Sequence, residues 1–163
     1  RPPDRLRAAQ ALPTRRLDRS RGEIIHPLAD DDTIVPHALA TVDAAIGDYS
    51  WAMAGTRIFN QHGMETAFRG GDEQSVRETA AGNYMLGGAV YWKRTLTDAV
   101  GGFGSAYDGA ADFELYRRFI RHRAPCVIGE ALYLYNDHPG TDSRVHDARQ
   151  AEASARIRQE GLA

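Results

Sequence analysis

Three consecutive carboxylates, on Asp30, Asp31 and Asp32, stand one residue after the short apolar stretch "EIIHPL". Adjacent negative charges raise one another's pKa and destabilise the fold unless a cation or a basic group compensates them. Carboxylate oxygens are hard ligands, which favour Mg²⁺, Mn²⁺ or Ca²⁺ over zinc. An EF-hand is excluded, because no loop that starts at these aspartates has Gly at its sixth and Glu at its twelfth position. A divalent metal site and a solvated, helix-capping turn both remain open from this stretch alone.

The elements around the aspartates are predicted from the apolar pattern. Residues 23–28 are partly β-branched and bounded by turn formers, which predicts a strand that delivers the aspartates at its end. Pro36 suits a first helical turn. Apolar residues then recur on one helical face, at Leu39, Val42 and Ile46. The predicted order is strand, acidic loop, helix.

The rest of the chain alternates in the same way. We expect a second strand at 49–60, a long flexible loop at 61–83 and a short helix at 93–100. The clearest helix is "ADFELYRRFIRHRA", which carries a broad apolar stripe. Two short strands, "PCVIG" and "ALYLY", follow it, and then a polar helix over 142–163. The pattern predicts one α/β domain over residues 1–163.

Composition is typical of a soluble globular protein. The chain has 163 residues, of which 42% are hydrophobic and 26% charged, and its net charge is −2. No apolar run approaches the roughly 20 residues of a membrane span, and no leader opens the chain. The single cysteine, Cys126, cannot form an intrachain disulfide. We therefore expect a cytoplasmic protein.

Basic residues crowd the N-terminal end, where Thr14 to Arg21 is predicted to form a short helix. Seven arginines lie here: Arg1, Arg5, Arg7, Arg15, Arg16, Arg19 and Arg21. They form either a solvated helix face or a surface for anionic lipid headgroups or a nucleotide diphosphate. The lipid alternative predicts peripheral contact with the inner face of the membrane. Nucleic acid is not expected as a partner, because the arginines are not interleaved with aromatic residues.

Three segments resemble the family 2 glycosyltransferases, and they occur in that family's order. "RGEIIHPLADDDTIVPHAL" is similar to the segment in which a Gly-led strand ends in an acidic D-x-D type turn before a Pro-started helix. "GGAVYWKRTLTDAVGGFGSAYDGAADFELYRRF" resembles the acceptor-side region, and "ALYLYNDHPGTDS" resembles the closing strand with its Tyr-x-x-His. The resemblance covers residues 14–143. It implies a GT-A type α/β fold, with a Rossmann-like sheet flanked by helices.

Two departures separate this sequence from the family pattern. The acidic turn usually reads Asp, small residue, Asp, Asp, whereas here Ala29 stands first and Asp30 takes the small-residue place. The acidic pair before the long helix usually reads Glu-Asp, whereas this chain has Ala111 followed by Asp112. The family's first strands, which hold the nucleotide base and ribose, have no counterpart here. We therefore expect the chain to be the C-terminal part of a catalytic domain.

The resemblance implies transfer of a sugar, with inversion, from a nucleoside-diphosphate sugar to an acceptor hydroxyl. The acceptor would be a carbohydrate, a lipid-linked molecule or a small molecule. The cofactor would be Mg²⁺ or Mn²⁺, bound mainly by Asp31 and polarising the diphosphate. Asp32 and His138 would assist as metal ligands, and Asp30 would help to bind the donor. For His138, a plain surface loop is the alternative.

Catalysis would fall to Asp112, which the resemblance makes the general base that takes the proton of the acceptor hydroxyl. The alternative is that this aspartate only caps its helix. Gly87 and Gly88 would let the backbone approach the donor sugar, or would simply form a tight turn.

Two other functional classes remain open. A metal-dependent phosphohydrolase would need a second carboxylate or His cluster, for which only His26, His37 and His138 are available as loose helpers. A non-catalytic α/β module would use the acidic turn structurally.

Overall fold

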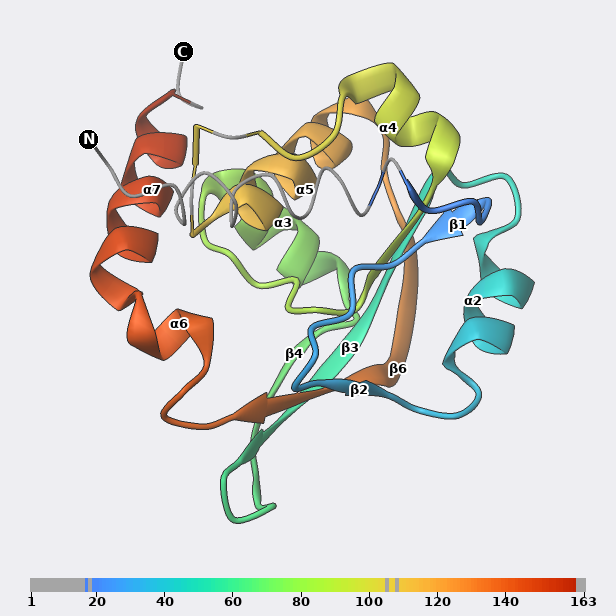
Figure 1. Ribbon diagram of the computed structural model, residues 1–163. Coiled ribbons are helices and arrows are strands. Elements are labelled where there is room, and N and C mark those ends of the chain that lie inside the picture. The colour runs from blue at the N-terminus through green and yellow to red at the C-terminus, as the bar shows by residue number, and fades with distance from the viewer. Residues whose placement is uncertain (1–16, 18, 105, 108, 161–163) are drawn as a thin grey trace.

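The computed structural model describes residues 17, 19–104, 106–107 and 109–160. These residues form a mixed α/β fold in which helices flank both faces of one curled sheet (Figure 1). The predicted helix at 14–21 and the arginine-rich end fall mostly outside the described residues. In chain order the elements are β1 (Ile24–Ile25), β2 (Thr33–Ile34), α2 (Ala38–Ile46), β3 (Trp51–Asn60), β4 (Glu65–Gly70), α3 (Glu73–Ala81), β5 (Val90–Lys93), α4 (Arg94–Val100), α5 (Ala111–His122), β6 (Cys126–Asp137), α6 (Asp142–Val145) and α7 (Asp147–Glu160).

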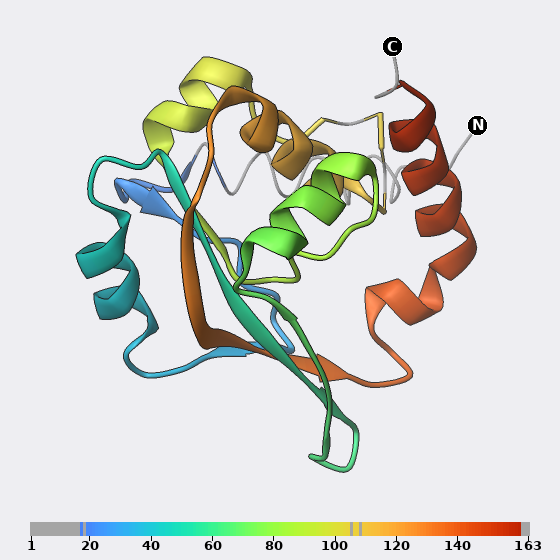
Figure 2. The ribbon, with the colours of Figure 1, turned by 180° about the vertical axis from the view of Figure 1, so that it is seen from behind.

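The sheet has the order β1–β5–β3–β6–β2, and β4 pairs with the second half of β3. Strands β3 and β6 run parallel, from Ala52 opposite Cys126 to Asn60 opposite Asp137. The other described pairs are antiparallel. The tip of the β3–β4 hairpin extends beyond the rest of the molecule in both views (Figures 1 and 2). Because β3 and β6 are parallel, their C-terminal ends lie at the same edge of the sheet.

Strand β3 is buried on both faces, which explains its nearly continuous apolar sequence. Ala52 and Ala54 pack with α2 on one face. Trp51 and Met53 pack with residues of α4 and α5 on the other. Side chains alternate along a strand, so neighbouring residues enter opposite cores. The α/β prediction and the strand at 49–60 are confirmed, the strand beginning at Trp51.

The predicted loop at 61–83 is wrong, because this stretch contains β4 and α3. Strand β4 leaves most of its side chains exposed, so it lacks the apolar alternation that marks a half-buried strand. Helix α3 begins after Asp72, whose carboxylate accepts a hydrogen bond from the Ser75 backbone N–H at 2.6 Å. It ends at Gly82, which has the left-handed φ of 107°. Both cap signals are present in the sequence.

Two further predictions need correction. "PCVIG" and "ALYLY" belong to one strand, β6, because the pairing with β3 resumes beyond an irregularity at 129–130. Leu39 is 61% exposed, and it is Ala38 that joins Val42 and Ile46 on the buried face of α2. The buried face therefore follows a strict four-residue spacing, and only the first member of the predicted stripe is wrong.

The predicted helices at 93–100 and 111–124 are confirmed as α4 and α5. The single polar helix predicted over 142–163 is wrong, because this segment forms two helices, α6 and α7, up to Glu160, and residues 161–163 lie outside the described residues. Helix α7 has a small apolar face, since Ala153 and Ile157 pack against Phe113 of α5. None of the described helices combines the length and apolar character needed to cross a bilayer.

Candidate functional site

The predicted site residues gather near the C-terminal ends of the parallel strands β3 and β6. The predicted strand at 23–28 is wrong in length, because β1 covers only Ile24–Ile25 and four residues outside any strand separate it from the acidic turn at 30–32. This turn connects β1 to β2, and β2 pairs with β6 through Thr33 and Leu134. This pairing brings the turn to the last residues of β6. In α/β sheets, ligands commonly bind beyond the carboxyl ends of the strands. The position of the acidic turn therefore agrees with a binding role.

Asp32 is tied to β6 through both carboxylate oxygens. The Tyr133 hydroxyl donates to one oxygen at 2.6 Å, and the Asn136 backbone N–H donates to the other at 2.8 Å. Burial raises the pKa of Asp32 above its ordinary value, and these two hydrogen bonds oppose the rise. The neighbouring Asp31 raises it further. Asp32 thus fixes the acidic turn to the sheet.

Asp31 faces His138, which lies just after β6. The His138 Nε2 and an Asp31 carboxylate oxygen are 3.1 Å apart. The backbone N–H of Gly140 donates to Nδ1 of the same ring at 3.1 Å, so the ring proton lies on Nε2 and is donated to Asp31. Asp30 is exposed at the surface of the turn. The structure therefore brings Asp31 and His138 together, 107 positions apart in the chain.

Asp112 lies in the first turn of α5. Its two carboxylate oxygens accept hydrogen bonds from the Tyr84 hydroxyl and from the Phe113 backbone N–H, both at 2.8 Å. The residue keeps some exposure, but protein atoms surround its carboxyl group, and this burial raises its pKa. Nearby Asp142 of α6 also raises it. The helix N-cap is Ala110, so Asp112 does not occupy the capping position.

Gly87 and Gly88 lie between the two acidic groups. The Tyr84 hydroxyl contacts the Gly87 carbonyl oxygen at 3.0 Å as well as Asp112. A Cβ at Gly88 would come within 2.4 to 2.9 Å of the Tyr133 ring, whose hydroxyl holds Asp32. One continuous path of contacts therefore runs from Asp32 through both glycines to Asp112.

The turn at Gly87 and Gly88 also requires glycine at its first position. Gly87 has a φ of 63°, in the left-handed region that disfavours a side chain. A Cβ there would lie 2.7 Å from the Thr56 hydroxyl oxygen. That hydroxyl is buried and has no hydrogen-bond partner among the described residues. The backbone thus comes close to β3 at this turn, and the predicted approach of this backbone to a donor sugar stays a prediction.

Two tyrosines that hold the carboxylates, Tyr84 and Tyr133, were missed by the sequence reasoning. Burial raises the pKa of each hydroxyl well above its ordinary value, so both remain protonated donors at neutral pH. Tyr133 stands in an apolar strand pattern and was read as a strand residue only. Tyr84 stands three positions before the first glycine of the turn, which is the one signal that could have drawn attention to it.

A divalent metal would find the exposed carboxylates of Asp30 and Asp31 here and not a complete set of ligands. Among the described residues, no three His, Cys, Asp or Glu side chains converge as a metal-binding group. Both carboxylate oxygens of Asp32 already accept hydrogen bonds from protein donors, and His138 donates its N–H to Asp31. Mg²⁺ is often held by one or two carboxylates together with substrate phosphates. Asp31 fits that arrangement, and the metal-ligand roles of Asp32 and His138 stay predictions.

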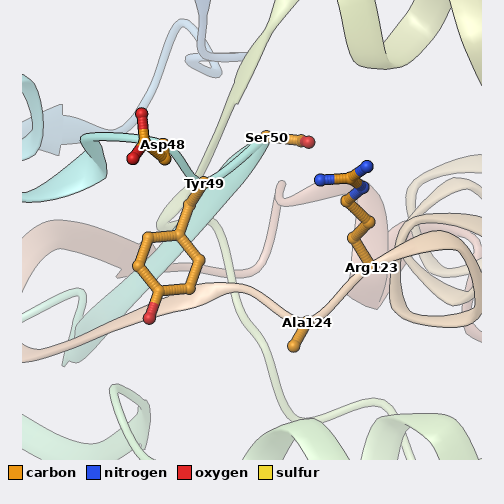
Figure 3. Close-up of a pocket in the computed structure, with 5 residues that line it drawn as sticks. All are labelled: Asp48, Tyr49, Ser50, Arg123 and Ala124. Atoms are coloured by element: carbon orange, nitrogen blue, oxygen red, sulfur yellow. The ribbon is translucent and has the colours of Figure 1, made fainter.

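Two cavities in the described part of the chain lie away from these residues. An open cavity of about 300 Å³ is lined by Asp48, Tyr49, Ser50, Arg123 and Ala124. It lies at the N-terminal ends of β3 and β6, where the Arg123 guanidinium is directed toward Ser50 (Figure 3). A smaller cavity of about 170 Å³ lies between α5 and α7. Neither is lined by Asp31, Asp32, Asp112 or His138.

No protein-family model matches the sequence, and no curated protein shows a significant match to it.

Proposed function

We propose that the chain is part of an inverting glycosyltransferase with a GT-A type fold, acting at the edge that holds Asp31 and Asp112. The observation that carries this proposal is the path of contacts joining two carboxylates, Asp32 and Asp112, across the turn at Gly87 and Gly88. A donor placed along this turn would have acidic groups at both ends, one for its diphosphate side and one for the acceptor.

Asp112 has the environment of a general base. A carboxylate works best as a base when its pKa lies closer to the working pH than that of a solvated aspartate. Burial raises the pKa of Asp112 in that direction. In the proposed reaction its free lone pair takes the proton of the acceptor hydroxyl, while the acceptor oxygen bonds to the anomeric carbon. The bond from that carbon to the diphosphate oxygen breaks on the opposite face, which inverts the configuration.

The diphosphate would lie near Asp31 and His138. The His138 N–H that now reaches Asp31 could instead donate to a phosphate oxygen. Asp31 would then be free for a divalent cation that arrives with the diphosphate. When bound, Mg²⁺ or Mn²⁺ supplies Lewis-acid stabilisation of the leaving group. Asp32 stays fixed to Tyr133 and Asn136 and holds the turn in place.

Calorimetric titration with nucleoside diphosphates tests this proposal. In the intact protein that contains this chain, we expect binding of a uridine, guanosine or thymidine diphosphate when Mn²⁺ is present, and we expect Asp31→Ala to abolish that binding. Asp98→Ala is the matched control, because Asp98 is exposed on α4. Absence of binding to all three diphosphates would contradict the proposal. Equal binding by Asp31→Ala would show that the acidic turn is structural.

A further inference from the structure

The Tyr84 hydroxyl has one proton and two acceptors within reach. It lies 2.8 Å from a carboxylate oxygen of Asp112 and 3.0 Å from the carbonyl oxygen of Gly87. A hydroxyl donates one hydrogen bond at a time, although its oxygen can also accept. Its burial keeps Tyr84 protonated, since the pKa is far above the ordinary value. The proton must therefore point at one of the two acceptors.

The charge state of Asp112 decides between them. An ionised carboxylate is the stronger acceptor, so it attracts the Tyr84 proton. A protonated carboxyl becomes a donor, and its O–H can point at the Tyr84 oxygen. The Tyr84 proton is then left to the Gly87 carbonyl. The other titratable groups that face Asp112 are Tyr116 of α5 and Asp142 of α6.

We propose that Tyr84 is a positioning residue whose hydroxyl switches between Asp112 and the Gly87 carbonyl as Asp112 loses or gains a proton. When Asp112 takes the proton of the acceptor hydroxyl, the Tyr84 O–H turns from the carboxylate to the carbonyl. The number of protons is conserved, because the only proton transferred is that of the acceptor hydroxyl, which moves to Asp112. Its use in catalysis rests on the proposed transferase function.

The switch couples the acceptor side of the site to the glycine turn. Gly87 is followed by Gly88, which lies against the Tyr133 ring, and Tyr133 holds Asp32. Proton uptake at Asp112 would strengthen the hydrogen bond that fixes the Gly87 carbonyl. The turn would then be held more firmly after proton transfer than before it. The backbone of the turn at Gly87 and Gly88 would therefore respond to the protonation of Asp112.

Nuclear magnetic resonance tests the switch without any substrate. The Asp112 carboxyl carbon and the Gly88 amide nitrogen are followed as pH is lowered, since the Gly88 amide shares its peptide group with the Gly87 carbonyl. In the wild-type chain both signals should titrate with the same midpoint. In Tyr84→Phe the Gly88 response at that midpoint should disappear. The Asp112 midpoint should also rise, because the Tyr84 hydrogen bond lowers its pKa.

Two variants serve as controls. Asp112→Asn should abolish the Gly88 response, and it also covers the case in which Tyr84→Phe fails to fold. Tyr133→Phe removes the corresponding hydroxyl from Asp32 and should leave the Gly88 response at the Asp112 midpoint. A wild-type Gly88 signal that does not follow Asp112 would overturn the switch, as would an undiminished response in Tyr84→Phe or Asp112→Asn.

A second measurement separates the switch from the transferase proposal. If sugar transfer occurs, the acid limb of its pH profile should move to higher pH in Tyr84→Phe, as the Asp112 midpoint does. An unmoved acid limb would overturn the catalytic use of the switch. Coupled titration without detectable transfer would support the switch and contradict the transferase function.

Discussion

The close contact between Gly88 and the Tyr133 ring allows us to predict how much stability is lost in Gly88→Ala. Three Tyr133 ring atoms would lie 2.4, 2.5 and 2.9 Å from a Cβ at Gly88, so the ring must move in Gly88→Ala. The ring is 2% exposed and meets the His26 ring edge-on at 5.5 Å, which leaves it little room. Gly88 does not have a positive φ, so the backbone itself accepts alanine.

The cost has two parts. Forced overpacking costs about 1–3 kcal/mol. Moving the ring also breaks the 2.6 Å hydrogen bond from Tyr133 to Asp32, and leaving a buried polar group unsatisfied costs about 1–3 kcal/mol. Gly88→Ala should therefore lower the free energy of unfolding by roughly 2–6 kcal/mol. Urea unfolding, with the m-value compared to wild type, measures this loss.

Gly129→Ala is the matched control, because its Cβ would meet nothing closer than the Gly71 carbonyl oxygen at 3.8 Å. It should change stability by about 0.5 kcal/mol or less. In a Tyr133→Ala background the cost of Gly88→Ala should largely vanish, which a double-mutant cycle would show. Equal costs for the two glycine variants, or an unchanged cost in the Tyr133→Ala background, would refute the reasoning.

Three further predictions concern stability, each measured by urea unfolding. Burial raises the folded-state pKa of Asp112, so the free energy of unfolding should fall as pH rises through that pKa. Asp112→Asn should remove this pH dependence, and a variant with the wild-type pH profile would contradict the prediction. Burial lowers the pKa of His26 below 6.5, so stability should fall as pH drops below 6.5, and His26→Gln should flatten this loss. Asp72→Ala should cost about 1 kcal/mol, because the 2.6 Å cap of α3 is lost, whereas exposed Glu73→Ala should cost less.

The sequence predicts the fold best where burial imposes a clear period. Strand β3 is apolar on both faces, and α5 carries a broad apolar stripe, so both were predicted. Strand β4 was not predicted, because its side chains are mostly exposed and leave no apolar pattern in the sequence. Its extended conformation is stabilised by its pairing with β3. The caps of α3 at Asp72 and Gly82 are present in the sequence, but the polar residues between them lack the apolar stripe that predicts a helix.

The candidate site was predicted through its aspartates and glycines and not through the tyrosines that hold them. Adjacent carboxylates stand out in a sequence because their repulsion needs an explanation. Tyr133 meets Asp32 across 101 positions and Tyr84 meets Asp112 across 28, and apart from the place of Tyr84 just before the glycine turn nothing local marks either pair. Tertiary hydrogen bonds of this kind depend on the sheet order, which the sequence pattern alone does not determine.

The central claim is that Asp112 is the base of a sugar transfer, and the transfer rate of Asp112→Asn tests it most directly. Asparagine keeps the size, and its one carbonyl oxygen can accept the Phe113 hydrogen bond while its NH₂ group faces the Tyr84 hydroxyl oxygen, but it cannot take a proton. Transfer from the donor that calorimetry identifies should fall by about 10²–10⁴, while donor binding and melting temperature stay near wild type. Asp142→Asn, at the neighbouring exposed carboxylate, should keep most of the activity. Transfer by Asp112→Asn at the wild-type rate, or a loss explained by unfolding alone, would contradict the account.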